Sequence, residues 1–501
     1  MKRLFRNVML MALATGISRI FGLLRDVTIA NRFGTSEVYD AFLIAFFLPV
    51  FLRKLLAEGA LSTAFIPVYT ESIITDDEAD RFASNVLSLL LILFPLVVAL
   101  GILLAPYYLP FLASGFPPEK LDLSIRLARI LFPFIAFVGF AAVFMGILNA
   151  HHRFFAASLS PIMFNLGMIG GALFLSPRFA VEPIYGLALG ALIGGAGQIL
   201  LQIPSLRRVK FRFRFTLLPL HPGIRTMGRL ILPALFGLAV MQLNLLVDNK
   251  IASHLPTGAI SSLQYAMRLF QLPLGVFAVS IATALLPCFS TSLADQKRER
   301  FSAYLADGVS ASAFILLPAM AGLYAIGPGL IRLIFEHGSF TPDDTLRTAN
   351  ILYFYLVGIL PYGLVSIFTR AFYALGRTRV PLLASACAVV ANITFNLLLV
   401  GPMQEGGLAL ATSIAGIVNA AILALFLWRK FPPKKEKFAE WGKIALGTGI
   451  VFVTAWMAQS LVGGRWAPVL LPTLVGAICY LAYARVSGLW RLIKISTDRP
   501  G

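Results

Sequence analysis

The 501-residue chain is 58% hydrophobic and only 13% charged, whereas a soluble domain has roughly 45–50% apolar and 25% charged residues. This composition predicts a polytopic membrane protein and excludes an ordinary soluble enzyme. The net charge of +19 does not indicate nucleic-acid binding, because the basic residues cluster in short loops between apolar runs, as the positive-inside rule predicts.

The apolar runs predict an all-α membrane protein, because a bilayer span takes about 20 residues in a helix. Fourteen such runs follow one another along the chain. The predicted spans are 8–30, 39–65, 84–112, 125–149, 158–176, 184–204, 226–253, 260–289, 304–335, 348–374, 381–400, 406–428, 441–461 and 467–485.

The distribution of lysine and arginine predicts that both termini lie in the cytoplasm. With an even number of spans, the most basic connections all fall on one side of the membrane, which the positive-inside rule assigns to the cytoplasm. These connections contain Lys2, Arg3 and Arg6, then Arg207, Arg208, Lys210, Arg212 and Arg214, then Lys297, Arg298 and Arg300, then Arg377 and Arg379, and finally Lys430, Lys434, Lys435 and Lys437.

Short motifs of the first half recur in the second half at an offset of about 220 residues, which predicts an internal repeat. The recurring motifs are Asp26-x-x-Ile-Ala with Asp248-x-x-Ile-Ala, Thr63-Ala-x-x-Pro with Thr283-Ala-x-x-Pro, and Arg81-Phe with Arg300-Phe. Each repeat holds six spans, so both halves have the same orientation and the substrate site is expected between them. We therefore predict an N-terminal six-helix lobe (1–204), a basic cytoplasmic linker (205–225), a C-terminal six-helix lobe (226–430), and a region with two further helices and a tail (431–501).

Charged residues inside the predicted spans are the main indication of function. Arg19 and Arg25 lie in the first span, Arg53 in the second, and Arg268 in the eighth, the repeat partner of the second. A charge at bilayer depth costs roughly 2.5–3.5 kcal/mol on insertion scales, so such residues usually face a wet cavity on a substrate path. The planar guanidinium binds phosphate through two hydrogen bonds, so the cargo is predicted to be anionic.

Carboxylates close to these arginines allow a second interpretation. Asp26, Asp40 and Glu58 lie near them in the sequence and could pair with them when cargo leaves, which would make them gating residues. Alternatively, each arginine pairs permanently with an acid and holds helices together. A buried salt bridge adds little net stability, so packing alone explains the set poorly.

A second polar group lies in spans eleven and twelve. Asn392 and Asn396 are one helical turn apart, and Thr412 follows in the next span. Together with Asp248 these oxygen-bearing side chains could bind Na⁺, although hydrogen bonding between helices is the alternative. Gly186-x-x-x-Gly190-x-x-x-Gly194 predicts close helix packing. The sequence has no phosphate-binding loop, so we expect a transporter rather than an ATP-hydrolysing enzyme.

The N-terminal motifs resemble those of a known transporter family. They are Gly22-Leu-Leu-Arg25-Asp26, Asp40-Ala-Phe, Leu48-Pro49, Leu52-Arg53-Lys54, Ala57-Glu58-Gly59-Ala60 and Ala64-Phe65-Ile66-Pro67-Val68. In this pattern the chain is similar to the MurJ (MviN-like) lipid II flippases of the multidrug/oligosaccharidyl-lipid/polysaccharide exporter superfamily. The resemblance is dense over residues 15–70 and diffuse but collinear over the rest.

The resemblance implies transport of lipid II, the undecaprenyl-pyrophosphate-linked peptidoglycan precursor, from the inner to the outer leaflet of the bacterial cytoplasmic membrane. It assigns substrate binding to Arg19, Arg25, Arg53 and Arg268, places an essential acid at Asp40, and implies a groove for the lipid tail at the last two helices. A sodium site of some members corresponds to Asp248, Asn392, Asn396 and Thr412. Asn396 stands where a second acid is expected, which departs from that pattern.

From these observations we expect a lipid II flippase that works by alternating access as a monomer, surrounded by membrane lipids and with the cell-wall synthesis machinery as a candidate partner. Na⁺ is the one candidate cofactor. A cation-coupled multidrug exporter or another exporter of polyprenyl-linked oligosaccharides from the same superfamily is the alternative. Multidrug substrates are typically cationic, which argues against that class. A non-transporting scaffold would not need charges inside its spans.

Overall fold

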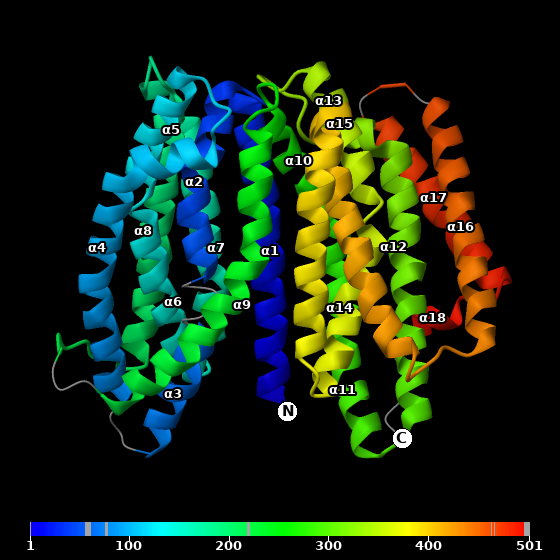
Figure 1. The fold of residues 1–501 in the computed structure, drawn as a ribbon, viewed down its shortest axis with the longest axis horizontal. Helices are drawn as coiled ribbons and strands as arrows, with labels where there is room; N and C mark the ends of the chain where they lie inside the picture. Colours follow the sequence, from blue (N-terminus) through cyan, green and yellow to red (C-terminus); the bar gives the residue numbers. More distant parts are fainter. Residues whose placement is uncertain are drawn as a thin grey trace. The chain divides into compact units, whose positions relative to one another are not determined.

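The computed structural model describes residues 2–55, 62–75, 79–217, 221–461, 463–464 and 466–494, and every regular element within these ranges is helical. The chain forms two compact units (Figure 1). The first contains residues 1–261 and 337–339, and the second contains residues 262–336 and 340–501. The predicted all-α fold is therefore confirmed.

The predicted spans of the first unit coincide with its helices, several of which are interrupted. Pro133 separates the two halves of the predicted span 125–149, and a π-helical turn ends the next span. The elements are α1 (Lys2–Phe33), α2 (Glu37–Arg53), α3 (Ser62–Thr75), α4 (Ala79–Leu112), α5 (Pro118–Leu131), α6 (Phe134–Ala150), α7 (Phe154–Gly170), η2 (Gly171–Leu175), η3 (Ser176–Arg178), α8 (Ile184–Arg208) and α9 (Pro222–Ala252).

The remaining predicted spans also fall on helices. The first residues of α10, up to Ser261, belong to the first unit, and the rest of these elements belong to the second. They are α10 (Ala259–Pro273), η4 (Leu274–Ala278), α11 (Val279–Ala294), α12 (Arg298–Ile334), α13 (Pro342–Leu356), α14 (Ile359–Ala374), α15 (Arg379–Trp428), α16 (Lys435–Ser460), α17 (Ala467–Val486) and α18 (Arg491–Lys494).

Nine helices in the described ranges are long and apolar enough to cross a membrane, and the bent pair α13 and α14 would make ten. The number of fourteen spans stays a prediction. The last two long helices, α16 and α17, lie side by side next to α12 (Figure 1). Tyr480 of α17 packs on Phe314 of α12, and its hydroxyl donates to the Phe314 carbonyl oxygen at 2.8 Å. This contact fixes the pair of added helices to the core of the second unit.

The glycines of α8 let this helix approach α7 closely, as their spacing predicts. A Cβ atom at Gly190 would lie 2.4 Å from the carbonyl oxygen of Gly167, and one at Gly194 would lie 2.8 Å from the Cα of Phe164. Any side chain at these positions would push the two backbones apart. The prediction of close packing at Gly186, Gly190 and Gly194 is confirmed.

The predicted linker 205–225 is ordered along α4 over its described part. Residues up to Arg208 complete α8, and the backbone N–H groups of Arg212, Arg214 and Thr216 donate to side chains of α4. Helix α9 then packs against α3 and α4 and belongs to the first compact unit. The compact units therefore divide after Ser261 rather than within the linker, because α9 finds its neighbours among the helices that precede it. The division into six-helix lobes, which rests on the repeat, stays a prediction.

Helix α15 contains two predicted spans, 381–400 and 406–428, joined by a tight turn. Gln404 has φ 49° and ψ −130°, a conformation that L-residues rarely adopt and glycine adopts readily. On either side of Gln404, contacts pair Leu399 with Gly407 and Asn392 with Thr412, at increasing distance along the chain from the turn. This pattern of contacts defines an antiparallel helical hairpin.

Replacing Gln404 with glycine should stabilise the protein. The substitution removes backbone strain of roughly 1–3 kcal/mol, offset in part by the greater conformational entropy of glycine in the unfolded chain. We expect Gln404→Gly to raise the thermal unfolding temperature in detergent. As a control, Gln271→Gly in the exposed helical part of α10 should lower it, because glycine costs about 1 kcal/mol inside a helix. Equal effects of the two variants would contradict this account.

Candidate functional site

Arg25 is held in place by partners on two helices. Its Nε and Nη2 atoms donate to Asp26 Oδ1 at 2.9 and 2.6 Å, and its Nη1 atom donates to Asn165 Oδ1 of α7 at 3.0 Å. Asn165 also donates through Nδ2 to the carbonyl oxygen of Ser18 in α1, at 3.2 Å. The guanidinium is thus fixed by a neighbouring acid and by an amide from another helix. Three of its five N–H groups are engaged within the described residues.

The other predicted arginines occupy positions of differing exposure. Arg19 is exposed on α1, and Arg53 is half-buried at the last residue of α2. Arg268 is half-buried on α10, in the second unit. Glu58, predicted as a gating residue, lies outside the described residues. The assignment of these side chains to substrate binding stays a prediction.

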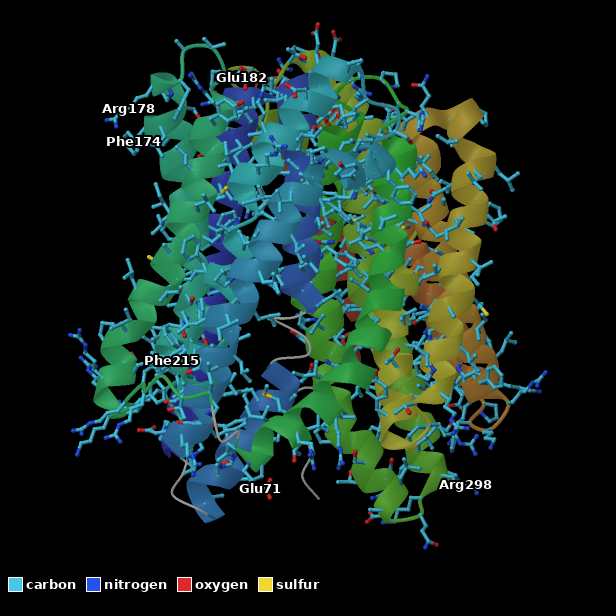
Figure 2. All side chains as sticks on the ribbon, turned by 60° about the vertical axis from the view of Figure 1, so that its left-hand side comes forward. Glu71, Phe174, Arg178, Glu182, Phe215 and Arg298 are labelled. Atoms are coloured by element: carbon cyan, nitrogen blue, oxygen red, sulfur yellow. The ribbon has the colours of Figure 1, made fainter. Side chains whose placement is uncertain are left out.

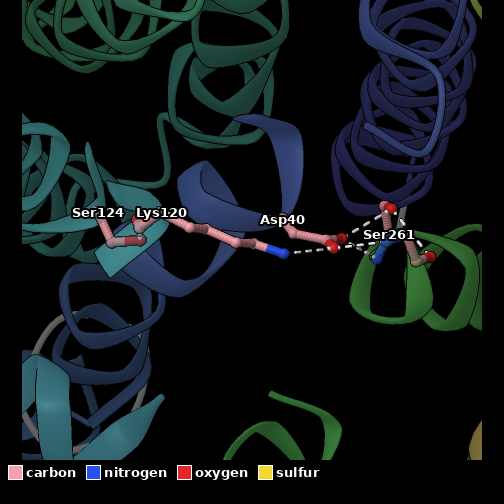
Figure 3. A network of polar contacts seen from close by, with 5 residues as sticks. Asp40, Lys120, Ser124 and Ser261 are labelled. Carbon is pink, nitrogen blue, oxygen red and sulfur yellow. Dashed lines mark hydrogen bonds and ion pairs between the residues drawn. The ribbon is translucent and has the colours of Figure 1, made fainter. Parts of the chain in front are cut away.

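Asp40 is buried and accepts four hydrogen bonds, none of them from the predicted arginines (Figure 3). Its Oδ2 atom accepts from Lys120 Nζ at 3.1 Å and from the Gly258 N–H at 2.7 Å. Its Oδ1 atom accepts from the backbone N–H and the hydroxyl of Ser261, both at 2.9 Å. The side chains of Asp40 and Lys120 are 1% and 4% exposed, so the ion pair is shielded from solvent.

The position of Asp40 makes it the cap of a helix that lies far away in sequence. The first N–H groups of a helix have no partner within the helix, and a carboxylate there satisfies them and interacts favourably with the helix dipole. Asp40 of α2 fills this role at the start of α10. Gly258 precedes that helix with φ 87°, in the left-handed region that favours glycine. Lys120, which also lies 4.1 Å from the centroid of the Phe116 ring, supplies the counter-charge.

Three polar residues of this region were not predicted from the sequence. Lys120 and Asn165 are the partners of Asp40 and Arg25, and Arg370 of α14 donates to Thr283 Oγ1 of α11 at 2.9 Å. Arg370 lies in the predicted span 348–374, and no acid pairs with it in the described part of the chain. A charge inside a span was the only available signal, and it applied to Arg370 as it did to Arg25.

The amides of α15 bind one another. Asn396 Nδ2 donates to Asn392 Oδ1 at 2.7 Å, and Asn392 Nδ2 approaches Thr412 Oγ1 at 3.4 Å. The three residues are therefore brought together across the hairpin, in the arrangement that hydrogen bonding between helices predicts. Asp248 is half-buried on α9 and belongs to the first unit. No cluster of three or more histidine, cysteine or acidic side chains able to hold a metal occurs among the described residues.

Known proteins share this sequence over most of its length. The family model described as "Lipid II flippase MurJ" matches residues 29–476. The chain belongs to the lipid II flippase MurJ family. A probable lipid II flippase MurJ of Thermotoga maritima is 32% identical over 490 residues, which cover 98% of each chain. A relative with the same description from Vibrio cholerae is 35% identical over 433 residues, which cover 84% of this chain and 82% of its own.

Solved structures agree with membership of the MurJ family. A structure of lipid II flippase MurJ in an inward closed conformation matches with a TM-score of 0.83 at 32% identity, and covers 95% of this chain and 98% of its own. An inward-facing multidrug transporter of the MATE family matches with a TM-score of 0.69 at 17% identity, over 86% of this chain. The second likeness shows a shared fold only. The chain is thus a bacterial multi-pass membrane protein of the MurJ family.

Removing the charge of Asp40 should destabilise the first unit. Asp40→Asn leaves the Lys120 ammonium buried without a counter-charge, which costs about 3–5 kcal/mol when one partner of a buried pair is removed. We expect a large fall in thermal unfolding temperature in detergent and a partial recovery in the double variant Asp40→Asn with Lys120→Met. The control is Asp122→Asn, which removes an exposed partner of Arg126 and should change stability by less than about 1 kcal/mol. An unchanged unfolding temperature for Asp40→Asn would refute the structural role.

Proposed function

We propose that this protein flips lipid II from the inner to the outer leaflet of the bacterial cytoplasmic membrane. The observation that carries the proposal is its membership of the MurJ family, whose model matches residues 29–476. The protein would act by alternating access, without covalent chemistry, as a monomer with both termini in the cytoplasm. Such a transporter needs a polar site for the head group and a lipid-facing path for the tail.

The proposed head-group site consists of arginines that offer planar hydrogen-bond donors to a pyrophosphate. Arg25 has two N–H groups beyond those engaged by Asp26 and Asn165. Because Asp26 balances its charge, Arg25 would contribute mainly directed hydrogen bonds. Arg19 is exposed on the same helix, six residues earlier, and would add positive charge. By the family resemblance, Arg53 and Arg268 would complete the site.

The proposed path for the polyprenyl tail follows the two added helices. Apolar side chains on the outer faces of α16 and α17 are exposed, among them Leu446 at 63%, Trp456 at 58% and Ile478 at 64%. Such side chains are compatible with acyl chains and would keep the tail in lipid while the head group crosses. Fixation of α17 on α12 through Tyr480 would hold this surface in place.

Replacing Arg25 with lysine tests the head-group site. Lysine keeps the charge but loses the planar fork, and a hydrogen bond to a charged group is worth about 1.5–3 kcal/mol. We expect Arg25→Lys to slow flipping by at least about tenfold. The assay uses proteoliposomes with labelled lipid II and an impermeant quencher.

Arg126→Lys is the matched control for this assay. Arg126 is exposed and pairs with Asp122 and Glu182 at 2.8 and 2.7 Å. It should flip lipid II at the rate of the unsubstituted protein. A normal rate for Arg25→Lys at normal protein levels would contradict the proposed role of Arg25.

Dependence on sodium is a separate proposal. A bound Na⁺ would require the side-chain oxygens of Asn392 and Thr412 to leave the hydrogen bonds that they now accept. We expect flipping in Na⁺ to exceed flipping in K⁺ or choline, and Asn392→Leu to abolish the difference. Equal rates in all three salts would leave the amides as contacts between helices.

A further inference from the structure

Five basic side chains lie in a short segment at one end of the first unit. Within the described residues, none of them forms an ion pair, and all five are exposed. They are Arg207, Arg208, Lys210, Arg212 and Arg214. We call residues 211–217 the linker segment. Its surroundings determine in which direction its side chains can point.

The backbone of the linker segment is bound to α4 by a row of polar side chains. The N–H groups of Arg212, Arg214 and Thr216 donate to Asp80 Oδ2, Ser84 Oγ and Ser88 Oγ at 3.2, 3.1 and 3.0 Å. We call these three acceptors the polar row of α4. Because the main chain makes these bonds, the side chains of the segment take no part in docking.

Two further bonds fix the end of the segment. Asn85 of α4 donates through Nδ2 to the carbonyl oxygen of Thr216 at 2.7 Å, and accepts through Oδ1 from the N–H of His221 at 3.0 Å. His221 in turn caps α9, since its Nδ1 atom accepts from the Gly223 N–H. The segment is thus held at both ends by ordered helices, which limits the movement of its basic side chains.

Aromatic and basic residues alternate along the linker segment. Phe213 and Phe215 are 44% and 62% exposed, and Phe215 projects from the surface (Figure 2). Alternate N–H groups bind one helix face, as in an extended chain, whose successive side chains point to opposite sides. Phenyl rings and guanidinium groups are therefore presented on different faces of the same fixed backbone.

We propose that the linker segment and the end of α8 bind the head groups of anionic phospholipids. The arginines and Lys210 would contact lipid phosphates, and the rings of Phe213 and Phe215 would lie at the boundary with the acyl chains. The segment is at the end of the long apolar helices α4 and α8, where head groups are found. Uncompensated basic residues next to a membrane span attract anionic lipid, and aromatic rings strengthen binding at the interface.

Two other occupants would need different features. A soluble polyanion would gain nothing from exposed phenyl rings in alternation with the charges. If the basic residues served only to orient the chain during insertion, the folded protein would show no preference for anionic lipid. The charge and the alternation together favour the phospholipid surface.

The test uses the full chain in nanodiscs of phosphatidylcholine, with or without phosphatidylglycerol. Native mass spectrometry counts the phosphatidylglycerol molecules retained, and thermal unfolding gives the stabilisation by this lipid. The unsubstituted protein should retain phosphatidylglycerol several-fold over its share in the disc. Arg212→Gln with Arg214→Gln should lose most of this preference and remain folded, because only backbone atoms of these residues bind α4.

Arg377→Gln with Arg379→Gln is the matched control, since it removes two exposed basic residues from a connection without aromatic alternation. It should keep the lipid preference. Phe213→Ser with Phe215→Ser should weaken retention but leave its dependence on salt. Unchanged retention in the Arg212 and Arg214 double variant would overturn the proposal. Displacement of the lipid by soluble pyrophosphate at equal concentration would also overturn it, in favour of a polyanion site.

Discussion

A charged group inside an apolar helical bundle is stable only when other parts of the protein replace the water that it has lost. Asp40 meets this condition with four donors, of which two are backbone N–H groups at the start of α10 and one is the ammonium of Lys120. The position of one carboxylate therefore determines the positions of α2, α5 and the first residues of α10. Moving any of the three would leave a buried donor or acceptor without its partner.

Arg25 meets the same condition in a way that suits a transporter of the MurJ family. Asp26 balances its charge, and Asn165 directs one of its amino groups, so the guanidinium has a defined orientation before any cargo arrives. Groups that are oriented in advance lose less freedom on binding. Asp40 and Arg25 thus represent two uses of buried charge, one that fixes helices and one that retains donors for a ligand.

The helices were predictable because a membrane span must be a long apolar run, whereas the partners of the charges were not. Pro133 and the strained residue Gln404 interrupt helices at positions that hydropathy does not reveal. Asn165 and Lys120 lie 140 and 80 residues from the side chains they bind, and an amide or a loop lysine carries no signal of its own. The internal repeat indicated which segments correspond, but gave no information on which helices become neighbours. For that reason the placement of α9 had to come from the structure.

The polar row of α4 limits its own length. Residues four apart on a helix are separated by about 6.0 Å along its axis, whereas alternate residues of an extended chain are separated by about 6.6–6.8 Å. The mismatch of about 0.7 Å per step is tolerable over Asp80, Ser84 and Ser88 but would exceed the range of a hydrogen bond after a few more. The two scales coincide only over a short stretch, like a vernier, so they fix the register of the linker segment. A slip of one residue would exchange its aromatic and basic faces.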